Sequence, residues 1–208
     1  MMPTAWGNGP TLSGYCRRWR SHGLWARLRD TLRPWARPCG GRLAEPSAGG
    51  VERQRIKTAT QGTDVGCAGN KTITGRKRHL LRATLGLIVA VVVTAANIDA
   101  RPGWVALRKA SCARGVKRLR QRWVDGGYAA PGLRDWVRGW TQPHKIDLEV
   151  VEHTGQGVVG IKQRWKVERT LAWVRNDRRH SRDYDGLTVH SEAMLQISMI
   201  RLLLKRLV

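Results

Sequence analysis

The chain has 208 residues, a mass of 23.4 kDa and a formal net charge of +23, with a pI of about 11.5. This length suits one domain, or one domain with a short arm, and a hydrophobic content of 41% excludes a disordered basic tail. The excess of positive charge indicates a polyanionic partner, with nucleic acid the first candidate and an anionic membrane surface the second.

Residues 12–33 form the first expected helix, because aromatic and leucine side chains recur there at near-helical spacing. We expect Pro34 to end this helix, and the glycines and prolines of residues 38–50 to form a linker. The first forty residues hold no apolar core of a secretory signal, and the longest apolar run, residues 85–96, is too short to span a membrane. The four cysteines include no CxxC pair, which argues against a zinc ribbon and fits a reducing compartment.

The rest of the chain has the pattern of several strands followed by alternating strands and helices. The predicted strands are 51–58, 76–84, 87–96, 121–125 and 148–152, with Gly86 near the turn of a hairpin. The predicted helices are 103–120, 131–139, 162–177 and 189–206. The last helix is expected to have one apolar face made of Val189, Ala193, Ile197, Ile200 and Leu204. This order predicts an α/β fold, with a mixed sheet flanked by helices.

Asp125 is a candidate site residue because acidic residues are scarce, at 15 against 38 basic ones. It ends a predicted strand, and Gly126 and Gly127 after it leave the backbone open to a phosphate or a metal. Asp-Gly is also a common turn dipeptide, and the local pattern by itself favours that simpler interpretation.

Glu168 lies on a predicted helix, four residues after Arg164 and seven residues before Arg175. At helical spacing the three side chains share one face, which would present a carboxylate to a metal with two cations beside it for phosphates. The simpler alternative is an ion pair between Arg164 and Glu168, which would stabilise the helix by about 0.3–0.5 kcal/mol.

Arg76, Lys77, Arg78 and His79 open the expected hairpin, and Lys71 precedes them closely. They form either a basic edge that follows DNA phosphates or a charged, solvated strand that resists edge pairing. The net charge favours the first interpretation. The histidines show no HxxxH or HxH spacing, which gives little support to a histidine metal site.

Several segments, in this order, resemble insertion-sequence transposases of the DDE class, the IS-four/IS-five type. EPSAGGVERQRIKT at 45–58 is similar to the family's EPSAGVIDSQSVKT, and GRKRHLL at 75–81 is similar to its GRKRHIL. VDGGY at 124–128 is similar to ADGGY, and RWKVERTLAW at 164–173 is similar to part of RRWVVERTFAWL. The resemblance covers most of the chain, and the ordered set is highly specific.

The resemblance implies an RNase-H-like catalytic domain over residues 45–208, preceded by a helical arm and linker over residues 1–44. It also implies three catalytic and metal-binding carboxylates, which carry over to Glu52, Asp125 and Glu168. Three converging carboxylates would repel one another unless a divalent metal neutralised them. Two Mg²⁺ ions would activate a water or a 3′-hydroxyl for attack on a phosphodiester and would stabilise the leaving oxygen.

The implied activity is DNA transposition, which means binding DNA, cleaving its strands and joining them at a target. The implied partner is double-stranded DNA, both as terminal inverted repeats and as target. The resemblance is compatible with a homo-oligomer and implies no membrane partner. The implied location is the bacterial cytoplasm, on the nucleoid when DNA is bound. The residues expected to contact DNA are Lys71, Arg76, Lys77, Arg78, His79, Arg164, Arg169 and Arg175.

The chain departs from the family pattern at several positions. Glu52 stands where the family has aspartate, and Arg53 and Arg55 replace two small serines on the opposite face of the predicted strand. We also expect the helical DNA-binding region that precedes the catalytic domain in relatives to be shortened here. A catalytically inactive, DNA-binding remnant therefore stays open beside an active transposase, and a basic RNA-binding structural protein ranks last.

Overall fold

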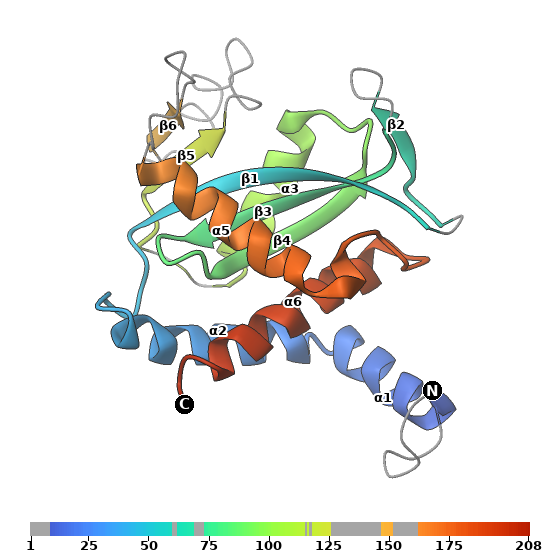
Figure 1. Cartoon of the computed structure of the whole chain (residues 1–208), viewed down its shortest axis with the longest axis horizontal. Coiled ribbons are helices and arrows are strands. Elements are labelled where there is room, and N and C mark those ends of the chain that lie inside the picture. Colours follow the sequence, from blue (N-terminus) through green and yellow to red (C-terminus); the bar gives the residue numbers. More distant parts are fainter. Residues whose placement is uncertain are drawn as a thin grey trace.

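The computed structural model describes residues 9–59, 62–68, 73–114, 116, 118–125, 147–151 and 162–208. Its helices are α1 (Gly9–Ser21), α2 (Leu24–Cys39), α3 (Ala100–Cys112), α5 (Lys162–Asn176), the 3-10 helix η4 (Arg178–His180) and α6 (Thr188–Leu204). Its strands are β1 (Ala48–Lys57), β2 (Gly66–Ala68), β3 (Ile73–Ala83), β4 (Ile88–Ala95), β5 (Gln121–Asp125) and β6 (Asp147–Val151). Figure 1 shows a sheet with helices packed around it, as predicted, and this arrangement is compatible with an RNase-H-like fold.

The sheet is mixed, with β1 at the junction of its two halves. β1 pairs antiparallel with β3, from Gly49 opposite Ala83 to Lys57 opposite Gly75. On the other side of β1, strands β5 and β6 run parallel to it, which gives the order β2-β3-β1-β5-β6, and β4 pairs with β3. The antiparallel half is closed by short turns, whereas the parallel half needs longer connections.

The turn between β3 and β4 is made by Gly86, as predicted. Its φ of +80° is a conformation that glycine adopts readily. The Gly86 carbonyl accepts a hydrogen bond of 3.1 Å from Thr170 Oγ1 of α5, and a Cβ at this glycine would lie 2.9 Å from Trp173 Cζ3. The tip of the hairpin therefore packs directly against α5 and holds that helix in place over the sheet.

Each face of the sheet has its own hydrophobic core. Leu81 faces α3 and packs in a cluster with Val51 and Trp104. Leu80, its neighbour in the chain, faces the opposite side, in a cluster that includes Leu195 of α6. Successive side chains of a strand point to opposite faces. Helix α3 therefore covers one face, and α2, α5 and α6 cover the other (Figure 1).

The N-terminal helical region breaks at Gly23 and continues past Pro34, so the prediction that Pro34 ends it is wrong. Gly23 has a φ of +66°, and α2 contains both Pro34 and Pro38. A proline in a helix interior costs about 3 kcal/mol because it removes a hydrogen bond. Here Ala36 and Arg37 are buried beyond the first proline, and their packing holds the helix together.

Two later helices also differ in detail from the prediction. α3 ends at Cys112 rather than Arg120, because the chain turns so that Leu119 enters the core beside β5. In α6, the expected face is wrong, since Val189 and Leu204 are 47% and 49% exposed. The buried residues of α6 are Ser191, Ala193, Leu195, Met199 and Leu203.

β2 was not predicted, since its three residues lie in a stretch rich in glycine and threonine, and the other described elements follow the sequence closely. β5 has the predicted bounds, and α5 ends one residue before its predicted end. The predicted helix at 131–139 lies outside the described residues.

The N-terminal helices are not separate from the rest of the protein, because α2 packs against α6. The division of the chain into an arm over residues 1–44 and a domain over residues 45–208 stays a prediction. Among the described helices, none is both long enough and apolar enough to cross a membrane.

Candidate functional site

The backbone places two of the three predicted carboxylate positions next to each other. β1 and β5 are parallel neighbours whose register pairs Val51 with Val124. Glu52 and Asp125 are the following residues of these two strands, so they occupy adjacent positions at the same end of the pair. Helix α5, which carries Glu168, contacts β1 and lies over this part of the sheet (Figure 1).

The side chains of Asp125 and Glu168 lie outside the described part of the structure, so the convergence of the three carboxylates stays a prediction. Glu52 is described, and it is 1% exposed. No cluster of three or more His, Cys, Asp or Glu side chains suited to a metal occurs among those that the structure describes.

Glu52 forms a buried ion pair with Arg82 of β3. Arg82 Nε donates to Glu52 Oε1, and Arg82 is only 2% exposed. Arg82 is opposite Gly50 in the β1–β3 register, and a Cβ at that glycine would lie 2.7 Å from Arg82 Nη2. The Arg82 guanidinium therefore lies over Gly50, which has no side chain, and reaches the Glu52 carboxylate two positions further along β1.

Two further cations lie near Arg82 and the Trp173 ring of α5: Arg169 of α5, and Arg206, which follows α6. The Arg169 guanidinium lies 4.9 Å from the centre of the Trp173 ring, and that of Arg206 lies 4.6 Å from the same ring. Burial, and then the charge of Arg82, lowers the pKa of Arg169. Burial, and then the charge of Arg169, lowers the pKa of Arg206. A series of interacting cations therefore leads from Arg82, the partner of Glu52, to Arg206.

The basic run of β3 is inside the protein, which contradicts both the exposed DNA-contacting edge and the solvated strand expected from the sequence. Arg76, Lys77, Arg78 and His79 are all buried, because β3 lies between β1 and β4 and helices cover both faces of the sheet. Their burial leaves no surface that a phosphate could reach. Lys71, the fifth member of this predicted group, lies outside the described residues.

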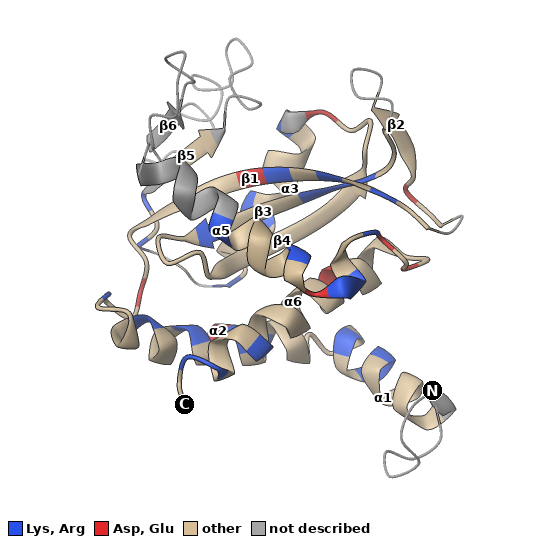
Figure 2. Ribbon diagram, in the orientation of Figure 1, with Lys and Arg blue, Asp and Glu red and all other residues tan. Residues whose placement is uncertain are grey.

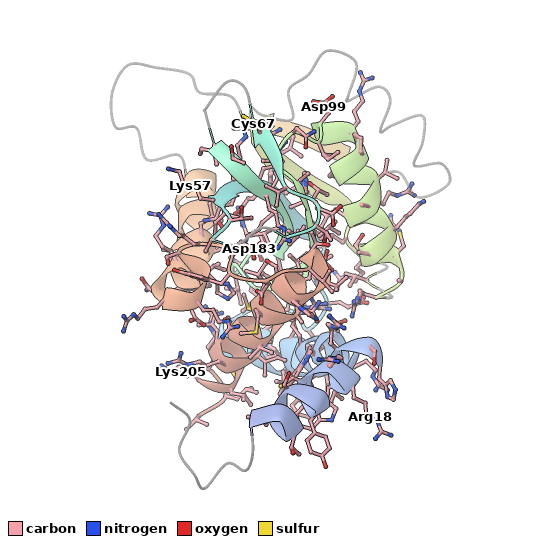
Figure 3. The ribbon with its side chains drawn as sticks, turned by 90° about the vertical axis from the view of Figure 1, so that its right-hand side faces the viewer. Arg18, Lys57, Cys67, Asp99, Asp183 and Lys205 are labelled. Atoms are coloured by element: carbon pink, nitrogen blue, oxygen red, sulfur yellow. The ribbon has the colours of Figure 1, made fainter. Side chains whose placement is uncertain are left out.

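The arginines of this run face the α6 side, where they tie the sheet to the segment before α6. Arg76 Nη1 lies 3.3 Å from Asp183 Oδ1, and this guanidinium also donates to the carbonyls of Thr63, Asp185 and Gly186. Figure 3 shows Asp183 in the interior of the protein, near the middle of the view. Arg78 Nη1 donates to the His180 carbonyl at 3.1 Å.

On the opposite face of β3, the buried Lys77 and His79 lie beside two partly buried arginines of β1. Lys77 Nζ donates to the Ile98 carbonyl, and a hydrogen bond of 3.1 Å joins His79 Nε2 to Thr94 Oγ1. Burial is the first cause that lowers the pKa of Lys77, and the charges of Arg53 and Arg55 add to it. These arginines thus lie on the face opposite to Glu52, as strand alternation predicts.

The end of α5 and the turn after it carry exposed arginines, of which the sequence had indicated only Arg175 as a DNA contact. Arg175, Arg178, Arg179 and Tyr184 line a shallow hollow, and Arg182 is exposed nearby in the sequence. Figure 2 shows basic positions on this turn and along α1 and α2. The density of arginines in residues 175–182 was the available signal. The side chain of Arg164 lies outside the described residues.

Comparison with known protein families gives a match that covers most of the chain. The family model for the transposase DDE domain matches residues 46–203. A search of curated proteins found no match to this chain.

Proposed function

Because this chain belongs to the transposase DDE domain family, we propose that it binds DNA and cleaves and transfers DNA strands by metal-dependent phosphoryl transfer. The observation that most supports this proposal is the register of β1 with β5. It gives Glu52 and Asp125 adjacent strand positions, with the helix that carries Glu168 packed against β1. Such a DNA substrate would keep the protein in the bacterial cytoplasm, on the nucleoid when bound.

Glu52, Asp125 and Glu168 are the residues that would hold the divalent ions. Carboxylate oxygens are the ligands that Mg²⁺ prefers, and the two glycines after Asp125 leave its backbone open. Bound Mg²⁺ would activate a water or a 3′-hydroxyl and stabilise the leaving oxygen. Glu52 fits this role less well than the other two, because its carboxylate is already paired with Arg82.

The proposed DNA-contacting surface is the group of exposed arginines at the end of α5, with Arg164 on the same helix. Arg175 and Arg178 are exposed and close to one another at the hollow described above. Guanidinium groups bind phosphate oxygens through two parallel hydrogen bonds. This surface takes over the role first predicted for the buried run of β3. A second copy of the chain could share the DNA in a homo-oligomer.

Neutralising Arg175 and Arg178 together is expected to weaken DNA binding and to flatten its salt dependence. If each arginine contacts one phosphate, the slope of log affinity against log salt concentration should fall by about 2 for Arg175→Gln/Arg178→Gln. Titration of a fluorescent DNA duplex at several salt concentrations measures this slope. The matched control is Arg18→Gln/Arg27→Gln, which removes the same charge from exposed positions of α1 and α2. If the slope fell equally for the control, Arg175 and Arg178 would not be specific phosphate contacts, and the proposed surface would be rejected.

Asp125→Asn is expected to lower Mg²⁺-dependent cleavage of the element's terminal repeats by about 100-fold or more, since even partners of metal ligands are worth 10–100-fold. Glu52→Asp is expected to raise cleavage, because it restores the family's residue. The control is Asp64→Asn, the same chemical change at an exposed position. The readout is the appearance of cleaved strands on a gel. Cleavage that Asp125→Asn leaves intact would reject the catalytic assignment.

The second candidate function is DNA binding without catalysis, and the Glu52–Arg82 ion pair favours it. It predicts salt-dependent DNA binding by a chain that shows no cleavage with Mg²⁺ or Mn²⁺. The third interpretation, a basic RNA-binding structural protein, does not account for the family match over residues 46–203.

A further inference from the structure

We propose that Arg82 acts as a built-in cation that occupies the Glu52 carboxylate and keeps a divalent metal off it. The inference rests on the proposed function, since it concerns the first carboxylate of that site. It identifies Arg82 as a residue that controls whether the carboxylate site can bind a divalent metal.

The ion pair is built into the strands. Gly50 leaves the space that the Arg82 side chain fills, and the guanidinium reaches Glu52 from the neighbouring strand. Both side chains are almost completely buried, at 1% and 2% exposure, so water screens their interaction little. A buried carboxylate needs a compensating cation, and in this fold Arg82 supplies it.

A divalent ion at the same carboxylate would meet this positive charge at close range. Like charges within a poorly screened site repel strongly. The metal and the guanidinium therefore compete for one carboxylate. Arg82 Nη1 is buried without a hydrogen-bond partner among the described residues, so the guanidinium is held by Glu52 and by its packing space rather than by a full set of hydrogen bonds.

The test removes the competing cation and measures metal binding directly. Arg82→Met keeps most of the side-chain length but has no charge, and it leaves Glu52 in need of a cation. Mn²⁺ binding is followed by the electron paramagnetic resonance signal of the free ion, and folding is followed by thermal unfolding. We expect Arg82→Met to bind Mn²⁺ at least tenfold more tightly than the natural chain, and to be stabilised by Mn²⁺.

The control is the double variant Arg82→Met/Glu52→Gln, which should lose this gain because the carboxylate is gone. If Arg82→Met does not fold, Gly50→Ala tests the same point, because its methyl group would displace the guanidinium while both charged groups remain. An unchanged Mn²⁺ affinity in a folded Arg82→Met or Gly50→Ala chain overturns the inference, as does a gain that survives Glu52→Gln.

The two proposals fail in different ways. A gain in Mn²⁺ affinity without DNA cleavage in any variant supports the role of Arg82 and rejects the catalytic function. Mg²⁺-dependent cleavage by the natural chain, with no gain in Mn²⁺ affinity for Arg82→Met, supports the function and rejects the role of Arg82.

Discussion

Arg76→Met is expected to lower the free energy of unfolding by about 3–5 kcal/mol, the usual cost of removing one partner of a buried ion pair. Arg76 and Asp183 are both fully buried and lie 3.3 Å apart at their nearest charged atoms. Without the guanidinium, the buried Asp183 carboxylate would lose its ion-pair partner and would be left with the charge of Arg78 and the Asp185 backbone N–H. The carbonyls of Thr63 and Asp185 would lose the Arg76 donor in the same step, and that of Gly186 would keep only the Thr63 N–H.

The expected damage is large because Arg76 joins parts of the chain that are far apart in sequence. Its partners include carbonyls 13, 109 and 110 residues away, in the segments before β2 and before α6. Loss of the guanidinium would therefore loosen the docking of α6 on the sheet as well as the local strand.

Urea unfolding followed by circular dichroism measures the effect. Arg178→Met, the same substitution at an exposed position of η4, should change the free energy of unfolding by less than about 0.5 kcal/mol. Equal stabilities of the two variants would mean that the Arg76 ion pair contributes little. The double variant Arg76→Met/Asp183→Leu should recover part of the loss, because it removes the stranded charge.

Apart from the three-residue β2, the described strands were predictable because their signals are local. The run of valines at 91–93 and the glycine at 86 identify the β3–β4 hairpin, and a short β-rich segment ending in Asp125 identifies β5. Residues next to each other in the chain determine such elements, and the structure confirms them. The family segments add the RNase-H-like fold, which periodicity alone leaves open.

The burial of charged residues was not predictable from the same local patterns. Arg76 and Arg78 look like surface residues by type, since arginine is almost never fully buried unless it is paired. Their partners at positions 180–186 are about a hundred residues further along the chain. The pairing of Glu52 with Arg82 likewise depends on the β1–β3 register, which sequence spacing does not give. The electrostatics of the site thus depend on ion pairs and hydrogen bonds between residues far apart in the sequence, which local patterns do not show.

The prediction of the apolar face of α6 was wrong for a different reason. Ile197 and Ile200 are half-buried, so this helix has apolar side chains around most of its circumference. Several faces then fit the helical period equally well, and packing against β4 and α2 selects one of them. Hydrophobic spacing identifies such a helix but does not orient it.

Acid is expected to destabilise the protein between pH 6.5 and about 4, because two histidines are buried in neutral form. Burial, and then the charges of Lys77 and Arg53, lowers the pKa of His79 to about 4. Burial, and then the charge of Arg78, lowers the pKa of His180 to about 4. In the unfolded chain both titrate near 6.5.

The sign follows from proton binding. Between pH 6.5 and 4, the unfolded chain binds protons on these histidines that the folded chain does not bind, so the free energy of unfolding falls as the pH falls. Above pH 6.5 both states are neutral at these residues, and their contribution no longer changes. The shifts correspond to a loss on the order of 3 kcal/mol for each histidine across the whole window.

Urea unfolding at pH 7.5, 6.5, 5.75 and 5 measures this slope while most carboxylates are still ionised. His79→Gln/His180→Gln should unfold with a much flatter pH dependence over this range, because glutamine does not titrate and can still hydrogen-bond to Thr94 and Ser198. His22→Gln, at an exposed position, should keep the natural slope. If the double variant lost stability with acid as steeply as the natural chain, the acid sensitivity would have to come from other groups, and the buried histidines would titrate alike in both states.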